Sequence, residues 1–198
     1  MITEQKIDDT IVRLSKLTEE EYISEYMAEM NKQINISNFM SESADHFMLE
    51  KDSENSMLEL CFQILNVYKE NFSDKYEIIS SDSLISSLNT RKKIQDTQAE
   101  ILNIDLTKDG ASAIEKKYDN IKKDIDKNPE KIDTKYKELF QAKEELENLR
   151  SQKYLFDYCA YFIENDKYTI EKDKPAISSI IDILLISLET QINGNNKQ

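Results

Sequence analysis

The stretch "DLTKDGASAIEK" begins at Asp105 and resembles the first half of a calcium-binding helix–loop–helix. Such a loop places oxygen ligands at positions one, three and five, a glycine at six and a bidentate glutamate at twelve. The first ligands are present as Asp105, Thr107 and Asp109. Gly110 fits the sixth position, but Lys116 puts a cation where the glutamate belongs. We therefore expect no metal here and predict that Gly110 ends one helix so that the next can begin.

His46 is the only histidine of the chain, and this limits the chemistry that the protein can perform. Di-iron helical bundles need two Glu-x-x-His motifs, and hydrolytic triads need a histidine base beside a nucleophile. Glu42 precedes His46 by one helical turn, but one such pair supplies too few ligands. With only two glycines, the chain also lacks a Gly-rich phosphate loop. We therefore predict a non-enzymatic protein without a cofactor or a metal, with His46 at or near its surface.

A row of glutamates at helical spacing, Glu21, Glu25 and Glu29, is the remaining candidate site. Neighbouring carboxylates can perform acid–base chemistry when one of them is desolvated. Seen together with the adjacent acidic residues, the row is more typical of a solvated acidic face. We predict that Glu20, Glu21, Glu25 and Glu29 dock a basic protein surface by electrostatic attraction.

The acidic residues are concentrated in the N-terminal half of the sequence. The net charge is −13, and residues 1–90 carry 18 acidic and 7 basic side chains, whereas residues 91–150 carry 14 of each. An acidic surface that is poor in arginine repels phosphate backbones, so we expect no direct binding to DNA or RNA. A basic protein partner is favoured instead.

The scarcity of glycine and proline predicts an all-α fold, arranged as a multi-helix bundle. The chain has two of each, whereas strands need turns that are rich in these residues. Apolar periodicity predicts helices that begin at Thr3, Thr18 and Pro175 or that cover residues 56–72 and 82–104. Residues 41–53 are polar and are expected to contain a break or a short helix.

The helix that begins after Thr18 opens with a capping box, in which Glu21 reaches back to the Thr18 amide. Three glutamates in its first turn also suit the helix dipole. Its apolar residues cover a broad face that we expect to be buried: Tyr22, Ile23, Tyr26, Met27, Met30 and Ile34.

Residues 111–163 carry a coiled-coil pattern in the middle of the chain. Apolar or aromatic residues recur every seven positions, as Tyr118, Ile125, Ile132, Leu139 and Leu146. The pattern is interrupted near Pro129, which suits the first position of a helix. We therefore predict a helical hairpin with helices at about 111–127 and 129–163. One long kinked helix is the alternative.

Two segments that are 92 residues apart resemble each other without a gap. "DKYEIISSDSLISSL" covers residues 74–88, and "DKYTIEKDKPAISSI" covers residues 166–180. The match indicates two related halves, at about 56–105 and 150–193, each built as helix, extended loop and helix. The alternative is coincidence in a chain that is rich in Ser, Ile and Lys.

The helix that begins at Pro175 is apolar on nearly all sides, which is typical of a central bundle helix or of one shared with a partner chain. We assign the following residues either to the core or to self-association in a homo-oligomer: Ile181, Leu184, Leu185 and Leu188. The longest apolar run, Ala176–Leu188, contains Asp182 and is too short to span a membrane. We therefore predict no contact with a membrane.

Cys61 and Cys159 lie in apolar helical surroundings, away from any CxxC motif or histidine that would activate them. We predict two buried, reduced thiols, which fit a reducing compartment. The first sixteen residues place two aspartates where the apolar run of a signal peptide would lie. We therefore expect a cytoplasmic protein, acting in the producing cell or in an infected host cell.

These features predict one helical domain over residues 1–193, followed by a disordered tail over 194–198. The expected function is protein binding, as an adaptor, chaperone, scaffold or inhibitor that docks a basic partner. The alternative is a nucleic-acid mimic that occupies the basic groove of a DNA- or RNA-handling enzyme, of the kind that phages encode. A mimic should carry carboxylates in rows about 7 Å apart, like phosphates along a strand, whereas an adaptor should expose an apolar patch.

Overall fold

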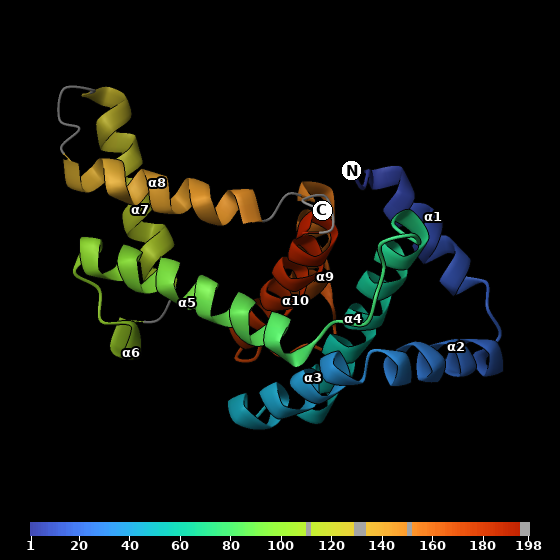
Figure 1. The fold of residues 1–198 in the computed structure, drawn as a ribbon. Helices are drawn as coiled ribbons and strands as arrows, with labels where there is room; N and C mark the ends of the chain where they lie inside the picture. The colour runs from blue at the N-terminus through green and yellow to red at the C-terminus, as the bar shows by residue number, and fades with distance from the viewer. Residues whose placement is uncertain (110–111, 129–133, 150–151, 195–198) are drawn as a thin grey trace. The chain divides into compact units, whose positions relative to one another are not determined.

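The protein is described by a computed structural model over residues 1–109, 112–128, 134–149 and 152–194, and these residues form helices without a strand (Figure 1). The helices of the first half are α1 (Glu4–Ser15), α2 (Glu19–Lys32), α3 (Ile34–Phe47), α4 (Lys51–Asn71) and α5 (Ser81–Leu102). Those of the second half are α6 (Leu106–Asp109), α7 (Ser112–Lys127), α8 (Thr134–Leu149), α9 (Lys153–Asn165) and α10 (Lys174–Gly194). The prediction of an all-α fold is confirmed.

The contacts within the chain divide it into two compact units, and the prediction of one helical domain stays a prediction. Unit 1 comprises Met1–Ser87 and Arg150–Gln198, and unit 2 comprises Leu88–Leu149. The division falls within α5, so the first seven residues of that helix belong to unit 1 and the rest to unit 2. Residues 195–198, most of the predicted disordered tail, lie outside the described residues, and that prediction is not tested.

The first two helices begin at the predicted positions, and a threonine hydroxyl caps each of them. The Thr3 side chain accepts a hydrogen bond from the Lys6 amide at the start of α1. At the start of α2, Thr18 and Glu21 form the predicted capping box. The break expected within residues 41–53 is confirmed: α3 ends at Phe47, Met48 adopts a left-handed conformation with φ of 50°, and α4 begins at Lys51.

The core of unit 1 is built around α4 and α10. In α4 every residue from Leu60 to Tyr68 is buried, and in α10 every residue from Ile180 to Glu189 is buried. α10 contacts α3, α4 and α9, so neighbouring helices cover its apolar sides. The four residues assigned either to the core or to self-association lie in the core: Ile181, Leu184, Leu185 and Leu188.

α10 is also long and apolar enough to cross a membrane by length and composition, over Lys174–Asn193 with a mean hydropathy of 1.4. It is the one such helix among the described residues. From the sequence, the apolar run Ala176–Leu188 is too short to span a membrane. Because 67% of its most apolar window is buried against unit 1, the helix has the burial expected of a core element.

The broad apolar face of α2 is only partly buried, which corrects the sequence prediction. The rings of Tyr22 and Tyr26 both pack edge-on against Phe62 of α4, with ring centroids 5.3 Å apart. Ile23 and Met27 remain 54% and 51% exposed, because α4 covers a stripe of α2 that is narrower than its apolar face. Ile34 is also exposed: α2 ends at Lys32, so Ile34 starts α3 and no longer shares that face.

Unit 2 contains two small apolar clusters that join α5, α7 and α8. One is formed by Ala99, Leu102, Ile114 and Leu139, and the other by Ile94, Ala142 and Leu146. Tyr118 of α7 and Phe140 of α8 pack edge-on with ring centroids 5.4 Å apart. α7 and α8 therefore share their core with α5, and the structure does not confirm a two-helix coiled coil.

The predicted helix over residues 129–163 is wrong. α8 ends at Leu149, and Gln152 has a non-helical backbone with φ of −91° and ψ of 67°. α9 then begins at Lys153 and belongs to unit 1. Residues 129–133, which include the predicted start of that helix at Pro129, lie outside the described residues.

The two segments that resemble each other in sequence differ in burial. Tyr76 is 7% exposed in the connection between α4 and α5, whereas Tyr168, its counterpart between α9 and α10, is 55% exposed. Both connections join two helices, but they do not place matching residues alike. The structure does not confirm two related halves.

Cys61 and Cys159 are buried free thiols, as predicted. Burial raises the pKa of Cys61 to about 12 and also raises the pKa of Cys159 well above its ordinary value. Because the thiolate is the reactive form, both side chains are held in an unreactive state.

We expect neither thiol to react with 5,5′-dithiobis(2-nitrobenzoate) at about pH 8 while the protein is folded, and both to react once urea unfolds it. The absorbance of the released product measures the reaction. Rapid modification of a thiol in the folded protein would show that α4 or α9 opens readily, contrary to the burial described above.

Candidate functional site

The N-terminal end of α2 is an exposed acidic surface. Glu20 and Glu21 line a shallow, open depression together with Leu17, Thr18, Ser24, Glu25 and Ala28. One oxygen of the Glu21 carboxylate accepts hydrogen bonds from the Thr18 amide and hydroxyl, both at 2.8 Å. These bonds lower the pKa of Glu21, the backbone bond contributing most, so the carboxylate stays charged while it caps the helix.

Glu25 is turned toward an internal partner. Its carboxylate forms a salt bridge of 2.8 Å with Arg13 of α1. The same guanidinium donates to Glu70 at 2.6 Å and to the Asn66 side-chain oxygen at 2.9 Å. Arg13 therefore joins α1, α2 and α4, and Glu25 presents less free charge to a partner than the sequence indicated.

Glu29 does not belong to the exposed acidic face that the sequence predicted. It is 2% exposed, and its two carboxylate oxygens accept from Lys69 Nζ at 2.8 Å and from the Tyr76 hydroxyl at 2.7 Å. Burial raises the pKa of the Tyr76 hydroxyl, and the hydrogen bond to Glu29 raises it further by a smaller amount. Glu29 thus links α2 to α4 and to the following connection, and it is unable to dock a partner from that position.

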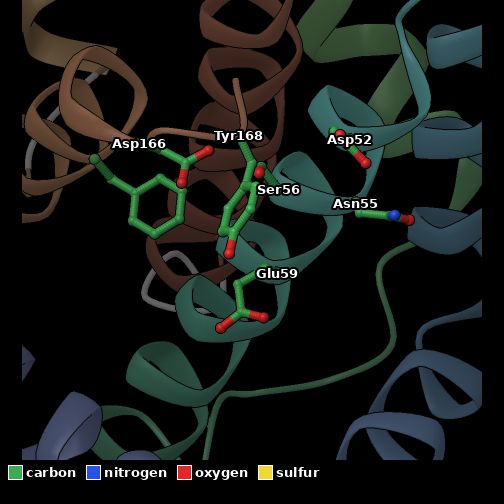
Figure 2. Close-up of a pocket in the computed structure, with 7 residues that line it drawn as sticks. Asp52, Asn55, Ser56, Glu59, Asp166 and Tyr168 are labelled. Carbon is green, nitrogen blue, oxygen red and sulfur yellow. The ribbon is translucent and has the colours of Figure 1, made fainter. Parts of the chain in front are cut away.

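A pocket of about 500 Å³ lies between α4 and the C-terminal end of α9 (Figure 2). α4 contributes a row at helical spacing, Asp52, Asn55, Ser56 and Glu59. Phe162 and the connection after α9, with Asp166 and Tyr168, form the other side. This site was missed from the sequence, although the polar row along α4 was a visible signal.

Two hydrogen bonds fix the connection after α9 against the beginning of α4. The Ile170 amide donates to the Ser53 hydroxyl at 3.1 Å, and the Glu50 amide donates to the Asp173 carboxylate at 3.0 Å. Both bonds join residues more than a hundred positions apart. They hold the two sides of the pocket together, so its shape is set by the fold of unit 1.

The carboxylates of the pocket have defined surroundings. Asp166 accepts from the Thr169 amide at 2.8 Å and the Thr169 hydroxyl at 2.7 Å. Burial alone would raise the pKa of Asp166, but these bonds and others from Ser56 and the Tyr168 backbone together lower it. The Glu59 carboxylate accepts a hydrogen bond from the side-chain nitrogen Nε2 of Gln63 at 3.1 Å. In Figure 2 the hydroxyl of Tyr168 is directed toward Glu59.

The described residues contain no group of three or more histidine, cysteine or acidic side chains that is arranged to hold a metal ion. His46 is exposed and packs edge-on against Phe47, with ring centroids 5.0 Å apart. In the stretch that resembles a calcium loop, Asp105 pairs with Lys108 at 3.2 Å, while Gly110 lies outside the described residues. The expectation that this stretch binds no metal therefore remains a prediction.

Comparison of the chain with protein-family models, with curated proteins and with solved structures found no match. The function is therefore inferred from the geometry and charge of the two surfaces described above.

Proposed function

We propose that unit 1 is a non-enzymatic, cytoplasmic protein-binding module that docks a basic protein partner through the exposed end of α2. Its charge supports this role: unit 1 carries 25 acidic and 13 basic side chains, a net charge of −12, whereas unit 2 carries 14 and 13, a net charge of −1. A charge of this size attracts a basic surface and accelerates its association. The module belongs to the class of adaptors, chaperones, scaffolds and inhibitors.

The observation that carries the proposal is the combination of exposed carboxylates and exposed apolar side chains on α2. Glu19 and Glu20 are exposed and form no ion pair within the described part of the chain. Ile23 and Met27 follow at helical spacing and are about half exposed. Binding would cover this apolar surface, and the carboxylates would select a partner with basic residues beside an apolar patch.

The same combination favours an adaptor over a nucleic-acid mimic. A mimic imitates a phosphate backbone, so it needs regular rows of charge and gains nothing from exposed apolar side chains. On the outer face of α2 the exposed carboxylate of Glu20 lies one turn before Ile23, and the uncharged Ser24 lies one turn before Met27, so carboxylates do not form a continuous row along it. An exposed apolar patch is the feature expected of a protein–protein contact.

A basic amphipathic helical peptide of repeated Lys and Leu is a defined probe for this surface. We expect the double variant Glu19→Gln/Glu20→Gln to bind it about 3- to 10-fold more weakly at low salt, with a smaller difference at high salt. Ile23→Ser/Met27→Ser should weaken binding at both salt concentrations, because the apolar contact is not screened. Fluorescence anisotropy of the labelled peptide measures these affinities.

The matched control is Glu4→Gln/Glu42→Gln, which removes the same charge from exposed positions on α1 and α3. This variant should bind the peptide nearly as well as the unmodified protein. Equal weakening by the two double variants would mean that the peptide responds only to net charge, and the assignment of the docking surface to α2 would be wrong.

A further inference from the structure

We infer that the pocket between α4 and α9 binds a guanidinium group, presented by an arginine side chain of a partner protein. The inference goes beyond the docking surface on α2, since it concerns a different face of unit 1 and names the chemical group that enters it. It is carried by the composition of the pocket, by the partners of the surrounding lysines and by the aromatic side chains that line it.

The pocket carries negative charge without an opposing cation in its lining. Its seven lining residues include the carboxylates of Asp52, Glu59 and Asp166 and no lysine or arginine. Lysines at the beginning of α4 and before α10 are paired with other acids: Lys51 with Glu54 and Lys172 with Glu50, both at 2.8 Å. A cation that enters the pocket therefore meets carboxylates that these lysines do not neutralise.

Aromatic rings give the pocket a second means of attracting a cation. Phe162 and Tyr168 both line it, and Tyr168 is 55% exposed. The Nζ atom of Lys167 lies 4.7 Å from the centroid of the Tyr168 ring, so a guanidinium that stacks on this ring must displace that ammonium group or use the other face of the ring. In the view of Figure 2 the Tyr168 ring appears between Asp166 and Glu59, and all three side chains line the same pocket.

The shape of the site favours a guanidinium over a metal ion or an ammonium group. Among the described residues, the three carboxylates of the pocket do not form a group that could hold a metal ion. A guanidinium is flat, stacks on aromatic rings and donates along its edge to separated carboxylates, whereas an ammonium is a compact point charge. A volume of about 500 Å³ is also large enough for an arginine side chain.

The test is a two-dimensional NMR titration of the full chain with N-acetyl-arginine methylamide. We expect saturable shifts of the backbone amides of residues 52–59 and 162–169. The lysine analogue should bind several-fold more weakly, and the citrulline analogue, which is neutral and of nearly the same shape, should produce no saturable shifts there. Equal binding of the citrulline or lysine analogue would overturn the proposal, as would shifts confined to other parts of the chain.

Two exposed substitutions test the residues of the site. Tyr168→Leu and Glu59→Gln should each weaken arginine binding about 2- to 5-fold. Tyr161→Leu, at a more exposed tyrosine of α9, and Glu42→Gln, on α3, are the matched controls and should leave it unchanged. Equal effects of each variant and its control would contradict the assignment.

Glu19→Gln/Glu20→Gln should also leave this titration unchanged, although it weakens binding of the basic peptide. The two proposals can therefore fail separately: loss of arginine binding in the α2 variant would place the cation on α2 and overturn the pocket assignment.

Discussion

Replacement of Glu29 by alanine is expected to lower the free energy of unfolding of unit 1 by about 2–4 kcal/mol. The substitution removes the acceptor for the Tyr76 hydroxyl, and Tyr76 is only 7% exposed, so the hydroxyl is left without that partner in a buried position. Lys69 also loses the carboxylate with which it forms a salt bridge, but its side chain is 44% exposed, so water can solvate the ammonium group. Most of the loss therefore comes from the tyrosine and from the small cavity that remains.

Urea denaturation measures this loss, and amide exchange in α4 reports it for unit 1 separately from unit 2. Glu20→Ala, at an exposed glutamate of the same helix, should change the free energy of unfolding by less than about 0.5 kcal/mol. Tyr76→Phe in a double-mutant cycle with Glu29→Ala should show a coupling of about 1 kcal/mol or more. If Glu29→Ala lowered the free energy of unfolding as little as Glu20→Ala, Glu29 would be exposed to water in solution. It would then again be assigned to the docking surface.

The difference between Glu20 and Glu29 marks the limit of what the sequence could predict. Both lie on α2 in an acidic context, and periodicity indicated that the acidic row faces water. Glu29 is buried because Lys69 and Tyr76, 40 and 47 residues further along the chain, meet it across the fold. Local spacing contains no information about partners at such separations.

The pocket illustrates the same limit for the candidate site. Its polar row on α4 can be recognised by spacing, but a row of this kind is ordinarily a solvated helix face. It becomes one side of a pocket only because the Ser53 hydroxyl and the Glu50 amide hold the connection after α9, at separations of 117 and 123 residues. The break after Leu149 was missed for a related reason: no glycine or proline lies between residues 140 and 160 to signal it.

Local signals succeeded where one short segment determines its own structure. Apolar periodicity predicted a helix that begins at Thr3, and the capping box predicted one that begins after Thr18. Both helices are present, and both threonines accept a hydrogen bond at the helix start. The last helix was predicted to be central or shared with another chain because apolar residues surround it on nearly all sides. The sequence left these two alternatives open, and they predict different responses to mutation and to protein concentration.

Leu184→Ala is expected to lower the free energy of unfolding of unit 1 by about 3 kcal/mol. Leu184 is fully buried in the unit 1 core, so the substitution removes apolar contacts and leaves a cavity that rigid neighbouring helices fill only in part. Ile23→Ala, at a residue that is 54% exposed on α2, should cost well under about 1 kcal/mol. Urea denaturation with amide exchange in α10 measures both changes.

Protein concentration distinguishes a core helix from a self-associating one. If the neighbours of α10 within one chain supply its burial, the midpoint of unfolding should stay constant over a roughly hundredfold range of protein concentration. A helix shared between two chains would give a midpoint that rises with concentration, because association stabilises the folded state. A rising midpoint that Leu184→Ala abolishes would show that α10 is an interface, and the core assignment of Leu184 would then be incorrect.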